Sequence, residues 1–239
     1  MDKFQPAFTN EQLSLPKAGG GVAVPDVNRV LRNTYWLLAL SMLPTIAGAF
    51  VGMQFNFIHL FVAAPILTPL LMFGVMIGAL FAVTALRNSA LGVPALLGFT
   101  FIAGLMLTPI LTVAMGLRNG GQLIGLAGGM TAVIFFALAS IATVTKRDFS
   151  FMGKFLFVGL ILLIVASLAN LFFQLPALQL TLSAVAVLIF SAYILYDVSD
   201  IVHGGETSYI TATLRIFLDI YNVFISLLNI LMALSGQRD

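Results

Sequence analysis

Long apolar segments separated by short polar breaks make up most of this chain. A helix that crosses the hydrocarbon core of a membrane takes about 20 predominantly apolar residues. Seven segments meet that length, and they cover residues 34–54, 61–86, 91–115, 122–145, 151–174, 178–202 and 208–235. The breaks are so short that consecutive helices must be antiparallel neighbours. The pattern predicts an all-α membrane protein, with seven transmembrane helices in one bundle over residues 26–239.

Composition supports this class and excludes several others. Hydrophobic residues make up 60% of the chain and charged residues 8%, whereas a soluble domain carries roughly 25% charged residues. The excess of 11 Lys and Arg over 9 Asp and Glu is too small to suggest a nucleic-acid partner. There is no cysteine for a disulfide or a thiolate metal site, and no common catalytic or nucleotide-binding motif. We therefore expect that the protein is not an enzyme and holds no permanent cofactor.

The N-terminal segment and the distribution of basic residues predict an orientation. Residues 1–25 contain three consecutive glycines and few large apolar side chains, which predicts a mobile polar tail. If the segments alternate across the membrane, the basic residues on the side of the tail are Lys3, Lys17, Arg29, Arg32, Arg87, Lys146, Arg147 and Lys154. Only Arg118 and Arg238 fall on the other side. Since Lys and Arg concentrate in cytoplasmic loops, the tail should be cytoplasmic. Seven crossings then place the C-terminus outside, unless the seventh segment is re-entrant.

A polar stripe runs along the seventh segment. At about 100° per residue, one arc of the helix holds Ser208, Thr211, Arg215, Asp219, Asn222, Ser226 and Asn229. The other faces are almost entirely apolar. Because lipid does not tolerate such a stripe, it should face protein or water. The last helix is therefore predicted to be central in the bundle.

Acidic residues in the last two segments are the main candidates for function. Asp197 and Asp200 share a face of the sixth segment. At 1.5 Å per residue, Asp197 and Asp219 lie roughly 9 and 15 Å from the same side of the membrane, so their carboxyl groups could meet. Two carboxyl groups in one site can share a proton, and Arg215 lies one turn before Asp219 as a charge partner. The cluster could sense protons or cations, or it could simply fix the register of two helices.

Three segments resemble a known family. The runs FTFIAGLMLTPIL, SAYILYDVSDIV and LRIFLDIYNVFISLLNIL are similar to the third, sixth and seventh helices of the Bax inhibitor-1 family, also called the transmembrane Bax inhibitor motif family. The likeness covers roughly residues 30–235. The segment HGGETSYITAT resembles the bacterial branch that modulates the membrane-anchored AAA protease of the inner membrane.

The resemblance implies several properties of this chain. It implies a seven-helix fold with a central last helix in the bacterial inner membrane. It also implies a pH-sensitive calcium leak that is gated by an aspartate pair, which falls on Asp197 and Asp219, the expected ligands of a transient Ca²⁺ ion. The basic residue that can latch onto the sixth-helix aspartate falls near Arg87. The chain departs from the family pattern at Arg215 and in the absence of an acidic residue from the second segment. Both departures make the site less negative.

Three functions remain open at this stage. The first is a cation leak gated by the aspartate pair. The second is a regulatory protein that modulates a membrane-anchored AAA protease and conducts nothing. The third is an intramembrane aspartyl protease, which would use Asp197 and Asp219 to activate water. The third is disfavoured, because Asp219 follows Phe217-Leu218 instead of the Gly-x-Gly of such proteases.

Overall fold

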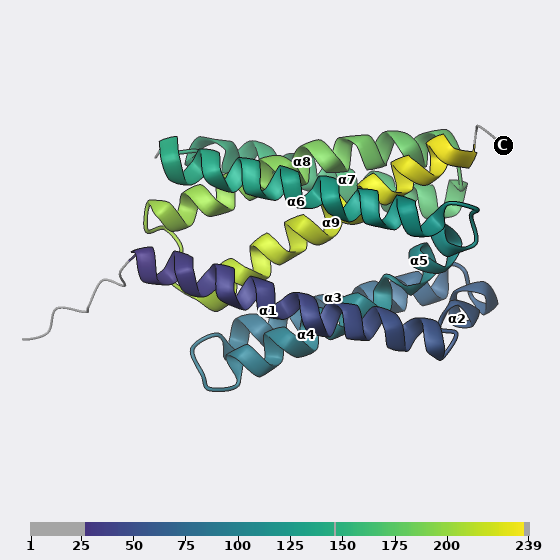
Figure 1. Cartoon of the computed structure of the whole chain (residues 1–239), viewed down its shortest axis with the longest axis horizontal. Helices are drawn as coiled ribbons and strands as arrows, with labels where there is room; N and C mark the ends of the chain where they lie inside the picture. The colour runs from purple at the N-terminus through teal and green to yellow at the C-terminus, as the bar shows by residue number, and fades with distance from the viewer. Residues whose placement is uncertain (1–26, 146, 237–239) are drawn as a thin grey trace, which may run out of the picture.

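The structure, a computed structural model, consists of helices joined by short loops (Figure 1). It describes residues 27–145 and 147–236, so the predicted tail at 1–25 lies outside the described residues. No strand occurs in the described part of the chain. The α-helices are α1 Val27–Gln54, α2 Ile58–Ala63, α3 Leu67–Leu86, α4 Gly92–Met106, α5 Thr108–Met115, α6 Gly120–Thr145, α7 Gly153–Phe173, α8 Pro176–Val202 and α9 Tyr209–Gly236, and a short 3₁₀ helix, η1, covers Ser150–Met152.

The predicted all-α membrane fold with seven transmembrane helices is confirmed. Seven helical stretches are long and apolar enough to cross a membrane: Val27–Gln54, Leu67–Leu86, Gly92–Met115, Gly120–Thr145, Ser150–Phe173, Pro176–Val202 and Tyr209–Gly236. The first begins several residues before the predicted start at 34, because the helix continues through a polar turn that hydropathy alone does not mark.

Prolines break two of the predicted segments. The second segment is divided into α2 and α3 around Pro65, and the third is divided into α4 and α5 at Leu107. Leu107 lies two residues before Pro109, which has no N–H to donate and whose ring clashes with the carbonyl four residues earlier. The breaks therefore follow from the backbone chemistry of proline. Helices α4 and α5 still form one spanning stretch, Gly92–Met115, whereas α3 spans without α2.

Helix α9 lies between two groups of helices. Figure 1 shows α6, α7 and α8 on one side and α1, α3 and α4 on the other, with α9 crossing obliquely between them. Helix α9 contacts α1, α3, α4, α5, α6 and α8. Phe217 and Val223 on different faces of α9 are both buried, and Phe217 packs edge-on against Phe99 of α4. These contacts support the interpretation of α9 as the central helix.

Glycines set the close contact between α1 and α4. A Cβ atom on Gly48 would meet the carbonyl oxygen of Phe101, and one on Gly104 would meet the carbonyl oxygen of Thr45. Only glycine therefore allows these two backbones to approach as they do. The same four-residue glycine spacing occurs on α3 and α6, but a Cβ atom there would meet open space at Gly74, Gly78, Gly125 and Gly129.

Candidate functional site

The structure brings Asp197 and Asp219 together where the second half of α8 runs beside the first half of α9. Both side chains are buried, since Asp197 is 6% and Asp219 is 5% exposed. Their carboxyl groups lie close enough to interact directly. The two acidic residues, which are 22 positions apart in the sequence (219 − 197), therefore form one site.

This carboxyl pair is suited to sharing a proton. A hydrogen bond between two carboxyl groups needs a proton on one of them, because ionised carboxylates only accept. With both groups ionised, the buried Oδ2 atom of Asp219 has no donor among the described residues. A buried charge without a partner costs several kcal/mol. The geometry of Asp197 and Asp219 therefore fits a pair that carries one proton and one negative charge.

Arg215 connects this pair to the loop between α8 and α9. Its Nη1 atom lies 2.9 Å from Oδ2 of Asp200 and 3.8 Å from Oδ1 of Asp197, and its Nη2 atom lies 3.7 Å from Oε2 of Glu206. The Arg215 side chain is 42% exposed, so water reaches the guanidinium from one side. One cation thus bridges three carboxylates, two on α8 and one in the loop.

Glu206 is a member of this site that the sequence pattern did not predict. Glu206 lies in the loop segment HGGETS, outside the helical periodicity that singled out the aspartates. Its Oε1 atom accepts a hydrogen bond from the backbone N–H of Ser208 at 2.8 Å, just before α9 begins. An acidic residue just before a predicted helix is a capping signal, and this signal was available in the sequence.

Two glycines shape the loop that carries Glu206. Gly204 has a φ of +76°, a left-handed conformation that favours glycine directly after a helix. The N–H of Gly205 donates to the carbonyl oxygen of Asp200 at 2.8 Å. A Cβ atom on Gly205 would collide with Oδ1 of Asp200. The Gly-Gly dipeptide therefore lets the loop fold back onto the carboxylate that Arg215 binds.

Arg87, the other predicted charge partner, does not join the site in this conformation. It is exposed in the turn after α3, and all ion pairs within 4 Å in the described part of the chain involve Arg215. The start of α4 places it near α9, because the Cα atom of Arg87 and the side chain of Ile210 both lie against Gly92. An exposed guanidinium gains little from a distant ion pair, whereas Arg215 already lies on α9 beside Asp197.

The rest of the polar stripe faces a cavity of about 390 Å³. Asn222, Ser226 and Asn229 line it from α9, and Gln179 and Ser183 line it from α8. The side-chain amide of Asn222 also donates to the carbonyl oxygen of Leu218 at 2.8 Å. The stripe therefore lies against α8 and a cavity on the side of the bundle formed by α3, α7 and α8.

The site alone does not form a calcium coordination shell. Ca²⁺ takes six to eight oxygen ligands, and among the described residues no three His, Asp or Glu side chains cluster as metal ligands. The pair of Asp197 and Asp219 supplies two carboxyl groups, with the positive charge of Arg215 nearby. Any calcium ion at the predicted position would therefore depend mainly on water for its ligands.

Comparison with known proteins identifies the family. Residues 27–236 match the family described as Bax1-I, Inhibitor of apoptosis-promoting Bax1, the Bax inhibitor-1 family. The chain belongs to this family. The match includes the residues of the α8 and α9 site, so the resemblance inferred from the sequence is confirmed.

Several bacterial members of the Bax1-I family are similar over most of their length. The chain is 38% identical to the modulator of FtsH protease YccA of Escherichia coli K12, over 86% of this chain and 90% of that protein. It is 42% identical to an uncharacterised protein of Campylobacter jejuni, over 89% of this chain and 91% of that protein. It is 40% identical to an uncharacterised membrane protein of Vibrio cholerae, over 86% and 90%. The chain is thus similar to bacterial membrane proteins over most of their length.

Proposed function

We propose that the protein is a proton-responsive leak for calcium or another cation in the bacterial inner membrane, gated by the pair of Asp197 and Asp219. The observation that carries this proposal is the buried carboxyl pair beside a bridging arginine. A membrane protein retains buried ionisable groups at considerable cost, so they are candidates for a functional site by default. The pair can change its charge without any other group entering the site.

The charge of the pair controls how tightly α8 and α9 are held together. When the pair takes up a second proton, Asp197 loses its negative charge and its attraction to Arg215, which is 3.8 Å away. When the pair loses its shared proton, two carboxylates face each other and repel. In either direction, the contact between α8 and α9 weakens. The cavity along Asn222, Ser226 and Asn229 offers polar groups to an ion that moves beside α9.

Ion flux into liposomes tests the proposal directly. The purified protein is reconstituted, and calcium and potassium fluxes are measured between pH 6 and 8. Asp197→Asn should flatten the pH dependence, because the amide cannot titrate. Asp148→Asn is the matched control, since Asp148 lies in the exposed loop before α7. A wild-type pH profile in Asp197→Asn, with normal folding, would leave the aspartates a purely structural role and contradict the leak.

A second function is favoured by one relative. The Escherichia coli protein that is 38% identical to this chain is named a modulator of FtsH protease, and we infer that this chain modulates a membrane-anchored AAA protease as well. The polar tail at residues 1–25 would be its contact with the protease. Deleting the tail should lengthen the half-life of the protein in cells that contain the protease and leave folding unchanged. Turnover at the wild-type rate would exclude the tail as that contact.

The proposed function also includes the orientation of the chain in the membrane and the absence of catalytic activity. With the tail in the cytoplasm, the end of the bundle that carries Arg87 and Arg147 also faces the cytoplasm. The acidic site lies in this half of the bundle. The protein acts by binding and conducting, without cleaving peptide bonds. The sequence before Asp219 supports this part of the proposal, because Phe217-Leu218 stand where an intramembrane aspartyl protease carries Gly-x-Gly.

A further inference from the structure

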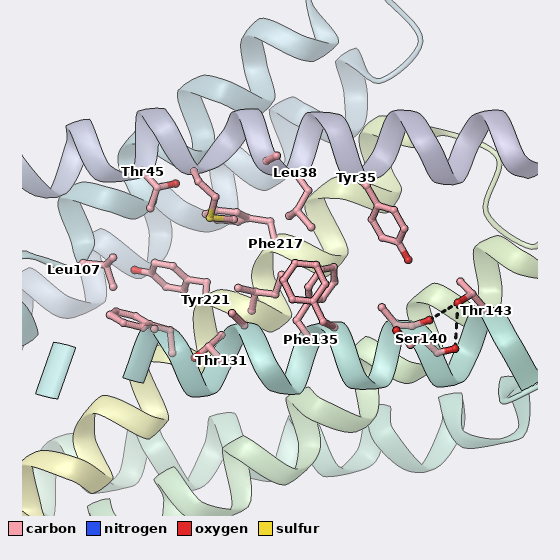
Figure 2. Close-up of a pocket in the computed structure, with 18 residues that line it drawn as sticks. Tyr35, Leu38, Thr45, Leu107, Thr131, Phe135, Ser140, Thr143, Phe217 and Tyr221 are labelled. Atoms are coloured by element: carbon pink, nitrogen blue, oxygen red, sulfur yellow. Dashed lines mark hydrogen bonds between the residues drawn. The ribbon is translucent and has the colours of Figure 1, made fainter. Parts of the chain in front are cut away.

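An apolar groove of about 600 Å³ lies on the opposite side of α9 from the polar cavity. Figure 2 shows it between α1 and α6, with α9 behind it as the floor. Leu38 lines it from α1, Phe135 from α6 and Phe217 from α9. Both flanking helices pack on α9. The groove is therefore a cleft in the side of the membrane-spanning bundle that opens towards lipid.

The hydroxyl groups inside the groove already have hydrogen-bond acceptors within the protein. Thr45 donates to the carbonyl oxygen of Ser41 at 2.8 Å, and Thr131 donates to the carbonyl oxygen of Ala127 at 2.7 Å. The hydroxyl of Tyr221 donates to a carbonyl oxygen of α4 at 3.0 Å. Since these donors are already used within the protein, the middle of the groove presents a hydrocarbon surface.

One end of the groove is polar and leads to basic residues. Figure 2 shows Tyr35, Ser140 and Thr143 gathered at this end, away from Thr45 and Leu107. Two exposed arginines continue beyond it. Arg32 precedes Tyr35 by one turn of α1, and Arg147 follows Thr143 by four residues, just after α6 ends.

The two arginines are available to a ligand. Neither Arg32 nor Arg147 forms an ion pair within 4 Å with an acidic residue in the described part of the chain. The nearest acidic residue in sequence, Asp148, accepts a hydrogen bond from the backbone N–H of Ser150 at 2.8 Å. The mouth of the groove therefore combines hydroxyl groups with a positive charge that no acidic residue in the described part of the chain neutralises.

We propose that this groove binds one anionic glycerophospholipid from the leaflet at the arginine end. Its acyl chain lies along α9 between α1 and α6, and its phosphate lies near Arg32 and Arg147. Three features support this occupant: the apolar interior, its opening to lipid, and the unneutralised arginines at its mouth. Basic pockets between membrane helices are known sites for anionic headgroups. A zwitterionic lipid fits the apolar part equally well but gains less from the arginines.

A lipid in the groove would contact both helices that flank α9. Helices α1 and α6 belong to the two groups that α9 separates, and each packs on α9 in the region of the groove. An acyl chain in the groove fills the space that neither helix occupies. The bound lipid should therefore stabilise the packing of both groups on α9, independently of the charge of the aspartate pair.

The test compares two lipids with the full-length protein in detergent. Phosphatidylglycerol and phosphatidylcholine with identical acyl chains are titrated, and bound lipid is counted by native mass spectrometry alongside the thermal midpoint. Phosphatidylglycerol should bind more tightly and raise the midpoint more. A basic residue near the surface is worth about fivefold in affinity, so the double variant Arg32→Gln/Arg147→Gln should weaken phosphatidylglycerol binding by roughly 25-fold. Lys154→Gln is the matched control, since Lys154 is exposed at the same end of the bundle on α7.

A second pair of variants tests the groove itself. Ala132→Trp places an indole in the groove and should displace the acyl chain, whereas Val133→Trp places it on the neighbouring lipid-facing position, which is 69% exposed. Loss of binding in Ala132→Trp alone supports the proposal. Equal affinity for the two lipids, or full binding by the double arginine variant, overturns it. If Ala132→Trp does not fold, the arginine variants still decide the question. A dimer that forms in place of the lipid complex would show that a second copy occupies the groove, and would also overturn it.

Discussion

Replacing Asp219 by asparagine tests the effect of a shared proton separately from the other interactions of the site. The amide of Asp219→Asn can donate to the Asp197 carboxylate as the protonated carboxyl does. The variant should therefore fold at neutral pH, with a free energy of unfolding within about 1 kcal/mol of wild type. Arg215 stays bound, because its carboxylate partners are Asp197, Asp200 and Glu206.

The two proteins should differ at alkaline pH. If the folded pair shares a proton that an unfolded aspartate lacks at neutral pH, the stability of the wild-type protein falls as pH rises. Once that proton is lost, the two carboxylates repel each other; for unit charges about 4 Å apart the repulsion is about 4 kcal/mol at an effective dielectric constant of 20. For a chain of this size, 4 kcal/mol corresponds to about 8–16 °C in the unfolding midpoint. Asp219→Asn never forms the doubly ionised pair and should not show this loss.

Thermal unfolding in detergent between pH 6 and 10, followed by intrinsic fluorescence, measures this difference. Asp219→Leu provides the comparison that removes the donor altogether. It leaves Asp197 buried with Arg215 at 3.8 Å as its closest cation, which should cost about 3–5 kcal/mol wherever Asp197 is ionised. The reasoning is refuted if Asp219→Asn loses as much stability at alkaline pH as the wild type.

Three further predictions address packing, topology and the loop before α7. Gly104→Ala forces a Cβ atom against the carbonyl oxygen of Thr45 and should lower the free energy of unfolding by about 1–3 kcal/mol. Gly125→Ala, whose Cβ atom meets open space, should leave it unchanged. Equal thermal midpoints for the two variants would contradict the contact between α1 and α4. A C-terminal phosphatase fusion should be active and a C-terminal fluorescent fusion dark, and the opposite result would mean that the seventh segment does not cross. Hydrogen bonds from Ser150 hold the pKa of Asp148 below its ordinary value. The carboxylate should therefore protect the Ser150 amide from hydrogen exchange at neutral pH and lose this effect only at a pH below the ordinary aspartate pKa. Asp148→Asn should show no such acid dependence.

Hydropathy, helix periodicity and loop length predicted most of the architecture. Seven apolar segments of sufficient length leave few alternatives in a membrane, because every backbone polar group must be satisfied within a helix. The stripe on the seventh segment likewise predicted that α9 turns its polar face away from lipid. The pairing of Asp197 and Asp219 was predicted from their depth in the membrane, since two charged groups at similar depth on adjacent antiparallel helices have few other partners.

The composition of the acidic site was less predictable. From the sequence, Arg215 was expected as a charge partner of the aspartate pair and Arg87 as the latch for Asp197. In the structure, Arg215 binds Glu206 and Asp200 as well as Asp197. Glu206 enters the site only because Gly204 and Gly205 fold the loop back onto α8, and loop conformation has no periodic signal in a sequence.

Glycine spacing shows the same division between sequence and structure. Pairs four residues apart occur on α1, α3 and α6, yet Gly48 on α1 meets another backbone, whereas Gly74 on α3 and Gly125 on α6 meet open space. The number of helices, their apolar faces and the charges within the bundle can be predicted from the sequence, because those properties depend on local chemistry and on the membrane. The tertiary structure alone decided which faces touch, which acidic residues share one arginine and where a groove stays open, because those depend on how the helices cross.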